Sequence, residues 1–351
     1  MADLMAFGIA LIASLGLTVP IRRLALRIGM VDQPNPRKVH RTPMPLLGGL
    51  AIYAGFVLAV LFSTSSQVRS QIVGILAGAT LLAAIGFLDD RGWLHPQIKL
   101  FVGMPFAAVL LLASGIRAGV VSYWLPSTFG HLLDAALTLF WVVGITAAFS
   151  ILDHMDGLCA GIAAIAAAFF ALLATQSGQF LVSTLAAAVL GAALGFLRWN
   201  FRPAKIFMGD GGALFLGFLM AALGLKLRLT TPTPLASWLA PVLILGVPIF
   251  DTTLITLSRA RRGLLPFASP GKDHVAHRLA NLGLGHRGAV LTLYSAGLAF
   301  GLSAWLIIRL PEKAVLSLAV TVVLVLLVAL AALERAPYER QLKPSRSAQA
   351  P

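Results

Sequence analysis

The chain has 351 residues, of which 58% are hydrophobic and only 11% are charged, and its mean hydropathy is +0.89. A soluble domain of this length does not need so much apolar surface, so the composition excludes a water-soluble globular protein. The net charge of +14 would suit a nucleic-acid partner, but the placement of the basic residues indicates membrane topology instead.

Apolar stretches near the 20-residue length of a spanning helix predict an all-α polytopic membrane protein with about eleven spans, ten being the alternative count. The first stretch follows Asp3 and precedes Arg22 and Arg23, the reverse of a signal peptide's charge order, so we expect a retained anchor. The expected spans are 4–21, 46–63, 71–88, 99–115, 132–150, 157–176, 180–197, 212–227, 235–257, 288–308 and 314–333.

Alternate loops differ in their content of Lys and Arg, which predicts the orientation. The segments 22–43, 89–99, 198–210, 259–287 and 334–351 hold 21 of the 27 basic residues. By the positive-inside rule these segments are cytoplasmic, so the N-terminus is expected outside and the C-terminus inside. We expect one transmembrane domain over residues 1–333, followed by a polar cytoplasmic tail over 334–351 that is disordered.

The loop after the first span carries basic residues among prolines, followed by Gly48 and Gly49. It could grip phosphates, or it could be an ordinary positive-inside loop that ends in a turn. The candidate phosphate-binding residues here are Arg37 and His40.

The third span ends in GFLDDRGWLHPQIKL, with adjacent Asp89 and Asp90 and with Lys99 at the start of the next span. Two neighbouring carboxylates repel, so one of them should have a raised pKa unless a cation lies beside them. The pair suits metal binding or proton abstraction, and the alternative is a solvated turn.

The segment SILDHMDGLCAG places Asp153 and Asp156 three residues apart, on one face of a helical turn, whereas His154 is expected to point elsewhere. Two acids in a short connection between spans favour a polar pocket over a purely structural role.

The segment NFRPAKIFMGDGGALFLGF, residues 200–218, runs from a basic loop into an aspartate flanked by glycines and then into an apolar helix. Asp210 is expected at a helix N-terminus, where the missing side chains of its glycine neighbours let a phosphate or a metal-bound ligand approach the backbone. With Lys205 nearby, the segment predicts a site for a cation and an anionic ligand, and the alternative is a charged loop before a helix.

Asp251 lies near the inner end of the ninth span, ahead of Arg259, Arg261 and Arg262, and it could pair with one of these arginines. In the loop that follows, His274 and His277 are three residues apart and Arg278 adjoins them. Such a histidine pair can bind zinc, but a third ligand at matching spacing is missing, so a phosphate or diphosphate is the favoured guest. We interpret His95, His131 and His286 as ordinary, and the single cysteine, Cys159, rules out an intrachain disulfide.

Taken in order, the motifs PNPRKVH with GG, GFLDD with a following Lys, LDHMDGLCAG, NFRPAKIFMGDGG, PIFDT and DHVAHRL resemble those of the polyprenyl-phosphate N-acetylhexosamine-1-phosphate transferases, glycosyltransferase family 4. They run from about residue 32 to residue 285. The match is closer to the WecA/TagO branch, which uses UDP-GlcNAc, than to MraY of peptidoglycan synthesis, whose run of consecutive histidines is absent.

The resemblance implies a plasma-membrane enzyme that transfers a sugar 1-phosphate from a UDP-sugar to a polyprenyl phosphate on the cytoplasmic side, with Mg²⁺ or Mn²⁺, and releases UMP. It assigns catalysis to Asp89, Asp90 and Asp210, and the metal to Asp210; our candidate co-ligands for the metal are Ser150 and Asp153. A homodimer is a further expectation. The implied substrate-binding residues are Arg37, His40, Lys99, Asp153, Asp156, Asn200, Lys205, His274, His277 and Arg278.

The chain departs from the family pattern at Ala147 and Ser150, where asparagines are usual, at Ala213 in place of a serine, and at Ala276 in place of a histidine. These departures leave open a diverged homologue of low activity, and an MraY-like transferase is the other alternative within the family. An ion-coupled transporter is the alternative of another class, but transport sites usually lie near the bilayer midplane. We expect the eight acids Asp32, Asp89, Asp90, Asp153, Asp156, Asp210, Asp251 and Asp273 to converge around one divalent cation.

Overall fold

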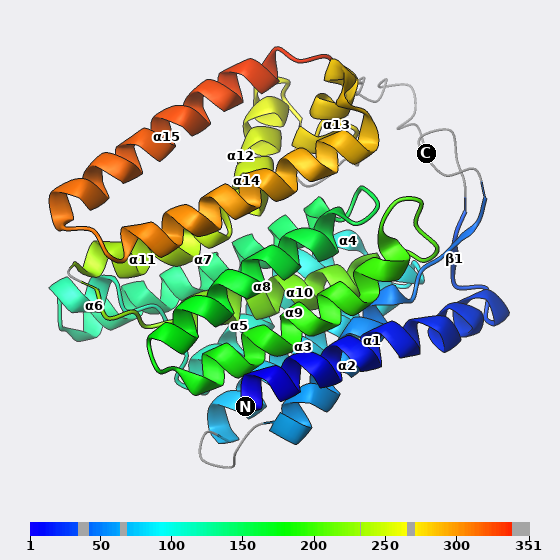
Figure 1. Ribbon diagram of the computed structural model, residues 1–351, viewed down its shortest axis with the longest axis horizontal. Helices are drawn as coiled ribbons and strands as arrows, with labels where there is room; N and C mark the ends of the chain where they lie inside the picture. Colours follow the sequence, from blue (N-terminus) through cyan, green and yellow to red (C-terminus); the bar gives the residue numbers. More distant parts are fainter. Residues whose placement is uncertain (34–41, 64–68, 232, 265–270, 339–351) are drawn as a thin grey trace, which may run out of the picture.

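The structure, a computed structural model, describes residues 1–33, 42–63, 69–231, 233–264 and 271–338 (Figure 1). Its first half comprises α1 (Ala2–Arg27), β1 (Val31–Asp32), β2 (Met44–Pro45), α2 (Gly48–Ser63), α3 (Arg69–Asp90), α4 (Pro96–Ile98), the π-helix η2 (Lys99–Gly103), α5 (Met104–Ala113), α6 (Val121–Trp124) and α7 (Thr128–Leu152). Its second half comprises α8 (Leu158–Gln176), α9 (Phe180–Asn200), α10 (Gly209–Lys226), α11 (Pro234–Ile244), α12 (Gly246–Arg261), α13 (Val275–Leu279), the π-helix η3 (Ala280–Leu284), α14 (Gly285–Ile307) and α15 (Glu312–Glu334).

The all-α membrane architecture is confirmed. Among the described residues, eight helical segments are long and apolar enough to cross a membrane, and α11 with α12 adds a ninth span if the bent pair is counted as one. Two shorter apolar helices, Gly48–Ser63 and Lys99–Ala113, complete the correspondence with the eleven predicted stretches. In the described part of the chain, strand pairing is confined to the two-residue β1 and β2.

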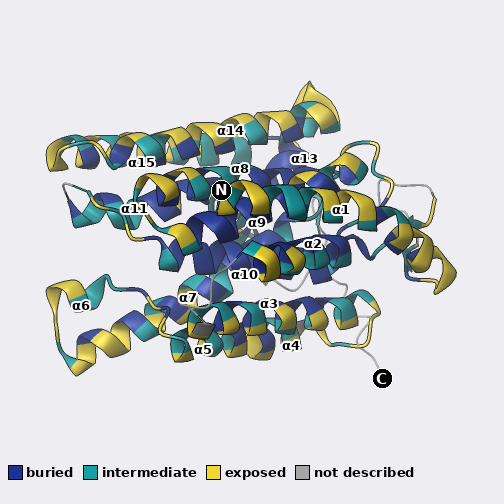
Figure 2. Ribbon diagram, turned by 60° about the horizontal axis from the view of Figure 1, so that its bottom comes forward, coloured by how far each residue is buried: buried dark blue, intermediate teal, exposed yellow. Residues whose placement is uncertain are grey.

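Helix α10 is the centre of the bundle. It packs against α3, α7 and α2, and 89% of its apolar window is buried, whereas only 6% of that of α15 is buried. Figure 2 shows α10 in the buried colour, with exposed residues on α1, α14 and α15 at the periphery. A helix that is apolar on all sides belongs inside a bundle, and α10 carries its one acidic residue at its N-terminus.

The predicted span 235–257 is not a single straight helix. The chain bends by 71° between α11 and α12, which corrects the expectation of one continuous span. Two features favour the break. Pro248 has no backbone N–H to bond to the carbonyl four residues earlier. Gly246 gives room for the Phe300 ring, which would lie 2.8 Å from an added Cβ.

Backbone contacts fix the start of α10 against α2. The amides of Gly48 and Gly49 donate to the carbonyls of Phe207 and Met208 at 3.0 and 2.9 Å. A Cβ at Gly49 would lie 2.2 Å from the nitrogen of Gly212, so only glycine permits this approach. The segment that leads into α10 is therefore held rigidly at one end of the bundle, where α3 and α7 also end.

Candidate functional site

Asp90, the last residue of α3, caps α10. Its two carboxylate oxygens accept hydrogen bonds from the backbone amides of Asp210 at 2.8 Å and Gly211 at 3.1 Å. These amides have no partner within the helix, and the N-terminal end of the helix dipole favours a negative charge. Gly209 adopts φ +74°, and a Cβ there would meet the Asp90 carboxylate at 2.4 Å. The structure therefore gives Asp90 a positioning role at the start of α10.

Lys99 forms ion pairs with two acids of this region, Asp89 and Asp210. Its Nζ lies 2.7 Å from Oδ2 of Asp89 and forms a second ion pair with Oδ2 of Asp210. Lys99 begins η2, and π-turns within helices are frequent at functional sites. The side chains of Asp89, Lys99 and Asp210 are 15%, 19% and 22% exposed, so solvent and a ligand can reach them.

Ser150 in the last turn of α7 donates a hydrogen bond from Oγ to Oδ1 of Asp210 at 2.8 Å. Asp153 follows directly after the end of α7. Burial raises the pKa of Asp153 to about 8, and the charges of Asp210, Asp90 and Asp156 add to the effect. We call Asp89, Asp90, Lys99, Ser150, Asp153 and Asp210 the aspartate site.

The donors of the aspartate site fit a hard divalent cation. Carboxylate and hydroxyl oxygens are the ligands that Mg²⁺ and Mn²⁺ prefer. Burial raises the pKa of Asp153, and the charges of Asp210, Asp90 and Asp156 raise it further, so a cation beside these acids would favour the charged form of Asp153. Lys99 now supplies the positive charge beside Asp210, so a metal ion held by Asp210, Ser150 and Asp153 would share this carboxylate with the lysine.

Asn200, predicted to bind substrate, connects two loops. Its side chain is buried, its Oδ1 accepts from the amide of Gly157 at 3.0 Å, and its Nδ2 donates to the carbonyl of Ile206 at 3.0 Å. The α7–α8 loop is thereby tied to the segment that leads into α10. These contacts support a positioning role for Asn200.

Asp156 and Lys205 lie at the rim of this region. Asp156 accepts a hydrogen bond from the amide of Ala204 at 3.2 Å and lines a small cleft together with Arg202 and His286. The ammonium of the exposed Lys205 lies 5.3 Å from the centroid of the Trp199 ring. The predicted phosphate-binding residues Arg37 and His40 lie outside the described residues.

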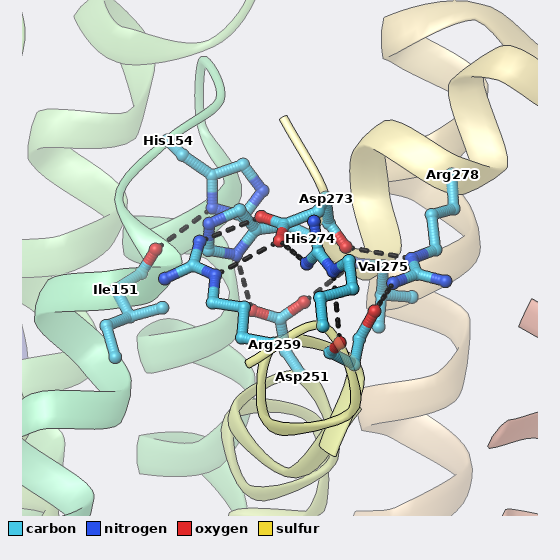
Figure 3. Close-up of polar contacts among 10 residues, drawn as sticks. Ile151, His154, Asp251, Arg259, Asp273, His274, Val275 and Arg278 are labelled. Carbon is cyan, nitrogen blue, oxygen red and sulfur yellow. Dashed lines mark hydrogen bonds and ion pairs between the residues drawn. The ribbon is translucent and has the colours of Figure 1, made fainter. Parts of the chain in front are cut away.

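A second polar cluster surrounds the loop before α13 (Figure 3). Asp251 lies 3.0 Å from Nδ1 of His274 and accepts a hydrogen bond from the amide of Val275 at 2.8 Å. The suggested pairing of Asp251 with an arginine of α12 is therefore wrong, because Asp251 is already engaged by the loop.

The arginines of α12 pair with Asp273 instead. Arg259 contacts its Oδ1 at 2.8 Å and Arg262 contacts its Oδ2 at 2.6 Å. Burial alone would raise the pKa of Asp273, but the hydrogen bonds from the two arginines outweigh it and hold the pKa well below its ordinary value. The Asp273 carboxylate is thus fully charged and neutralised by protein groups.

Arg278 is completely buried, and its contacts are made to protein groups. Its guanidinium donates to the Asp273 carbonyl and to Ser258 Oγ, each at 2.8 Å. It also donates to the Leu333 carbonyl at 2.8 Å and to Glu334 at 3.0 Å, near the end of α15. The structure supports a positioning role for Arg278, and its expected phosphate contact remains a prediction without support from these contacts.

Two histidines that were assigned no role from the sequence lie in this second cluster. His154 was expected to point away from the acids, yet its ring stacks on that of His274 with centroids 3.9 Å apart. Burial, and then the nearby His274, hold the pKa of His154 well below its ordinary value. His286, interpreted as ordinary, lies 6.4 Å from His277 between ring centroids. No sequence spacing indicates these contacts, because each joins a different pair of loops or helices.

The acids therefore form two groups rather than one. Asp89, Asp90, Asp153 and Asp210 belong to the aspartate site, whereas Asp251 and Asp273 are bound by His274 and by arginines of α12. The expected convergence of eight acids on one cation is wrong for the second group. The first group lies where α3, α7 and α10 meet, whereas the second group lies between α12 and the loop before α13.

Residues 72–228 match the family model described as glycosyl transferase family 4. A Bacillus subtilis protein named "Probable undecaprenyl-phosphate N-acetylglucosaminyl 1-phosphate transferase" is 40% identical over 301 residues, which cover 85% of this chain and 83% of that protein.

Two further relatives come from other bacterial lineages. The "Decaprenyl-phosphate N-acetylglucosaminephosphotransferase" of Mycobacterium tuberculosis is 34% identical over 79% of this chain and 75% of its own length. The "Undecaprenyl-phosphate alpha-N-acetylglucosaminyl 1-phosphate transferase" of Yersinia pestis is 30% identical over 85% of this chain and 83% of its own length. The resemblance drawn from the motifs is confirmed: this multi-pass membrane protein belongs to glycosyl transferase family 4.

Proposed function

We propose that this chain transfers N-acetylglucosamine 1-phosphate from UDP-GlcNAc to undecaprenyl phosphate, releases UMP, and uses Mg²⁺ or Mn²⁺. The observation that carries the proposal is the junction at Asp210. One carboxylate at the start of the central helix is bound by Lys99 and Ser150, and Asp90 caps the same helix end. This junction lies in a chain that is 40% identical to a relative named for this chemistry.

The chemical problem is the repulsion between two anions, because the lipid phosphate must attack a phosphorus atom of the nucleotide-sugar diphosphate. Lys99 places a fixed positive charge between Asp89 and Asp210, and the N-terminus of α10 adds the favourable end of its dipole. A divalent cation held by Asp210, Ser150 and Asp153 would neutralise charge on the phosphate oxygens as it develops.

Asp89 and Asp90 differ in what they can do. Both oxygens of Asp90 are engaged by backbone amides, so it fixes the geometry of Asp210. The Asp89 side chain contacts the side chains of Lys99 and Asp210, holds no backbone amide of α10, and is partly exposed. We assign to Asp89 the role of receiving or orienting the lipid phosphate group, and to Lys99 that of holding it near Asp210.

An apolar cavity offers a place for part of the prenyl chain. It has a volume of about 240 Å³ and lies between the bent pair α11 and α12 and the peripheral helices α14 and α15. Its lining includes Leu243, Phe250, Phe300 and Leu326, and polar surface is nearly absent. Burying a hydrocarbon chain there would stabilise its binding by about 25 cal/mol for each Å² of apolar surface removed from water.

The active site is proposed on the cytoplasmic side of the plasma membrane. The basic segments of the chain, which hold 21 of the 27 Lys and Arg residues, include the loops around Lys99, Lys205 and Arg278. The positive-inside rule therefore places the aspartate site on the side where UDP-sugars are made. A cysteine introduced near Asp210 should react with an impermeant thiol reagent only in inverted vesicles.

The direct test uses the purified full chain in detergent. UMP should be released from UDP-GlcNAc only when undecaprenyl phosphate and Mg²⁺ or Mn²⁺ are both present, and chelation should stop the release reversibly. A panel of other UDP-sugars identifies the donor. Absence of UMP release with every sugar and metal would discard the proposal.

Two alternatives remain distinguishable. A diverged binding protein would bind UDP-GlcNAc without releasing UMP, and Ser150→Asn would restore release; against it, Ser150 still presents an oxygen to Asp210. An ion-coupled transporter would show counterflow in proteoliposomes; against it, the acids lie at the ends of α3, α7 and α10 rather than at their middles.

A further inference from the structure

His154 carries a nitrogen that the proposed transfer does not use. Its Nδ1 lies 3.0 Å from the carbonyl of Ile151, which can only accept, so Nδ1 carries the proton. Its Nε2 then bears the lone pair. This atom is buried and has no hydrogen-bond partner among the described residues. A buried acceptor without a hydrogen bond is energetically unfavourable, which indicates a missing partner.

Two other residues offer ligand atoms close to the ring of His154. His154, Asp251 and His274 each offer one ligand atom, and these three atoms all lie within 4.8 Å of one another. The three residues come from the α7–α8 loop, from α12 and from the loop before α13, and Figure 3 shows their side chains facing one another. We call these three residues the histidine site. Of the histidine pair in this loop only His274 takes part, and the other two ligands come from other segments.

We propose that the histidine site binds a transition-metal cation of the Zn²⁺ or Co²⁺ type, separately from the aspartate site. Two imidazoles and one carboxylate form a donor set that suits these borderline cations, whereas Mg²⁺ prefers an all-oxygen set. Three protein ligands leave one position of a tetrahedral cation free for water or another ligand.

Hydrogen bonds to backbone groups already orient two of the ligands, as in known metal sites. The Ile151 carbonyl fixes the tautomer of His154, and the amide of Val275 holds the second oxygen of Asp251. Asp273, the other acid nearby, is neutralised by Arg259 and Arg262, so a cation at this site would take Asp251 Oδ2 in place of its present contact with His274 Nδ1.

Metal binding requires a small adjustment. Ligands of a tetrahedral zinc ion lie roughly 3.3 Å apart, given bond lengths of about 2.0–2.1 Å. The present separations of up to 4.8 Å must therefore shorten by about 1.5 Å at most. The rings of His154 and His274 are 27° from parallel, and turning one of them about its terminal torsion brings its nitrogen toward the shared centre. A bound cation would therefore link these three segments, one of which, the α7–α8 loop, also carries Asp153 of the aspartate site.

The test uses the full chain in detergent, without a polyhistidine tag and with excess Mg²⁺ to occupy oxygen sites. Titration with Co²⁺ should reach one equivalent per chain and produce visible d–d bands, and elemental analysis after Zn²⁺ exposure should give the same stoichiometry. His154→Leu, which keeps an apolar surface against His274, should weaken Co²⁺ binding at least about 10-fold, because removal of supporting groups alone costs 10–100-fold.

Matched variants make the result specific. His131→Leu, at an exposed position near the start of α7, should bind Co²⁺ like the unaltered protein. Asp251→Asn keeps an oxygen for the Val275 amide and should also weaken binding, which covers the case that His154→Leu does not fold. The proposal is overturned if the unaltered chain binds no Co²⁺, if His154→Leu and His131→Leu bind alike, or if Asp210→Asn removes the binding.

Discussion

At the scale of single residues, the proposed site depends most on Asp210. Its carboxylate contacts Lys99 and Ser150, while its backbone amide is held by Asp90. Removing its charge would leave Lys99 with a single carboxylate partner and would remove the donor around which the proposed cation site is built. The backbone contact to Asp90 would remain, because it does not involve the Asp210 side chain.

We therefore expect Asp210→Asn to fold normally but to lower the rate of UMP release at least about 100-fold, the size typical for loss of one preorganised electrostatic contact. The rate is measured with saturating UDP-GlcNAc and lipid, and a thermal melt in detergent checks folding. Asp3→Asn is the matched control, since Asp3 binds Thr184 in another part of the bundle. Equal activity of the two variants would contradict the role of Asp210.

Asp90→Asn should behave differently from Asp89→Asn. An amide in place of the Asp90 carboxylate turns one acceptor into a donor that faces a backbone N–H, which costs about 1–3 kcal/mol of unfolding free energy. The melting temperature should fall by several degrees, and activity should fall with it. Asp89→Asn should lose activity while its melting temperature changes little. The reverse pattern would show that Asp90 is the chemical group and Asp89 the structural one.

At the scale of elements, glycine sets the distance between α3 and α10. A Cβ at Gly86 would lie 2.4 Å from the carbonyl carbon and oxygen of Asp210, so the two backbones touch directly. This approach brings Asp90, one turn further along α3, to the amides that it caps. The polar geometry of the site thus depends on an apolar helix contact.

Gly86→Ala should force α3 away from α10 and lower activity strongly, although it removes no polar group. Overpacking of this kind costs about 1–3 kcal/mol in unfolding free energy. Gly144→Ala on α7 is the matched control, because an added Cβ there meets nothing within 4 Å, and it should leave both activity and melting temperature unchanged or slightly raised. If Gly86→Ala retained full activity, the close helix contact would not be what positions the aspartate site.

At the scale of the whole molecule, the bend between α11 and α12 and the loosely packed α15 leave the apolar cavity of about 240 Å³ between them. Helix α15 is nevertheless tied at its end, where Arg278 binds the Leu333 carbonyl and Glu334. These hydrogen bonds therefore link α15, a helix at the edge of the bundle, to α13, which directly follows His274 of the histidine site.

Filling the cavity should discriminate among lipid acceptors. Ala319→Trp, on the lining of the cavity, should raise the KM for undecaprenyl phosphate several-fold while changing the KM for a short prenyl phosphate much less. Ala332→Trp, at an exposed position near the end of the same helix, controls for the added ring. The same KM change for both lipids, or for both variants, would show that the cavity does not hold the prenyl chain.

The structure brings together some of the residues that the sequence motifs singled out and leaves their predicted roles as predictions. The motifs identified Asp89, Asp90, Lys99, Ser150 and Asp210, which the structure brings into direct contact. They did not separate the capping role of Asp90 from the exposed position of Asp89. That distinction depends on the axial register of α3 against α10, which a local sequence pattern does not encode.

The sequence by itself determined the membrane class, the approximate position of the spans and the family, because apolar length and short motifs are local properties of the chain. Only the tertiary structure decided that the acids divide into two groups, that α12 is bent from α11 and that His154 meets Asp251 and His274. The physical reason is that these contacts join residues far apart in the chain, such as His154 and His274, which are 120 positions apart. Such contacts are fixed by helix packing rather than by sequence spacing.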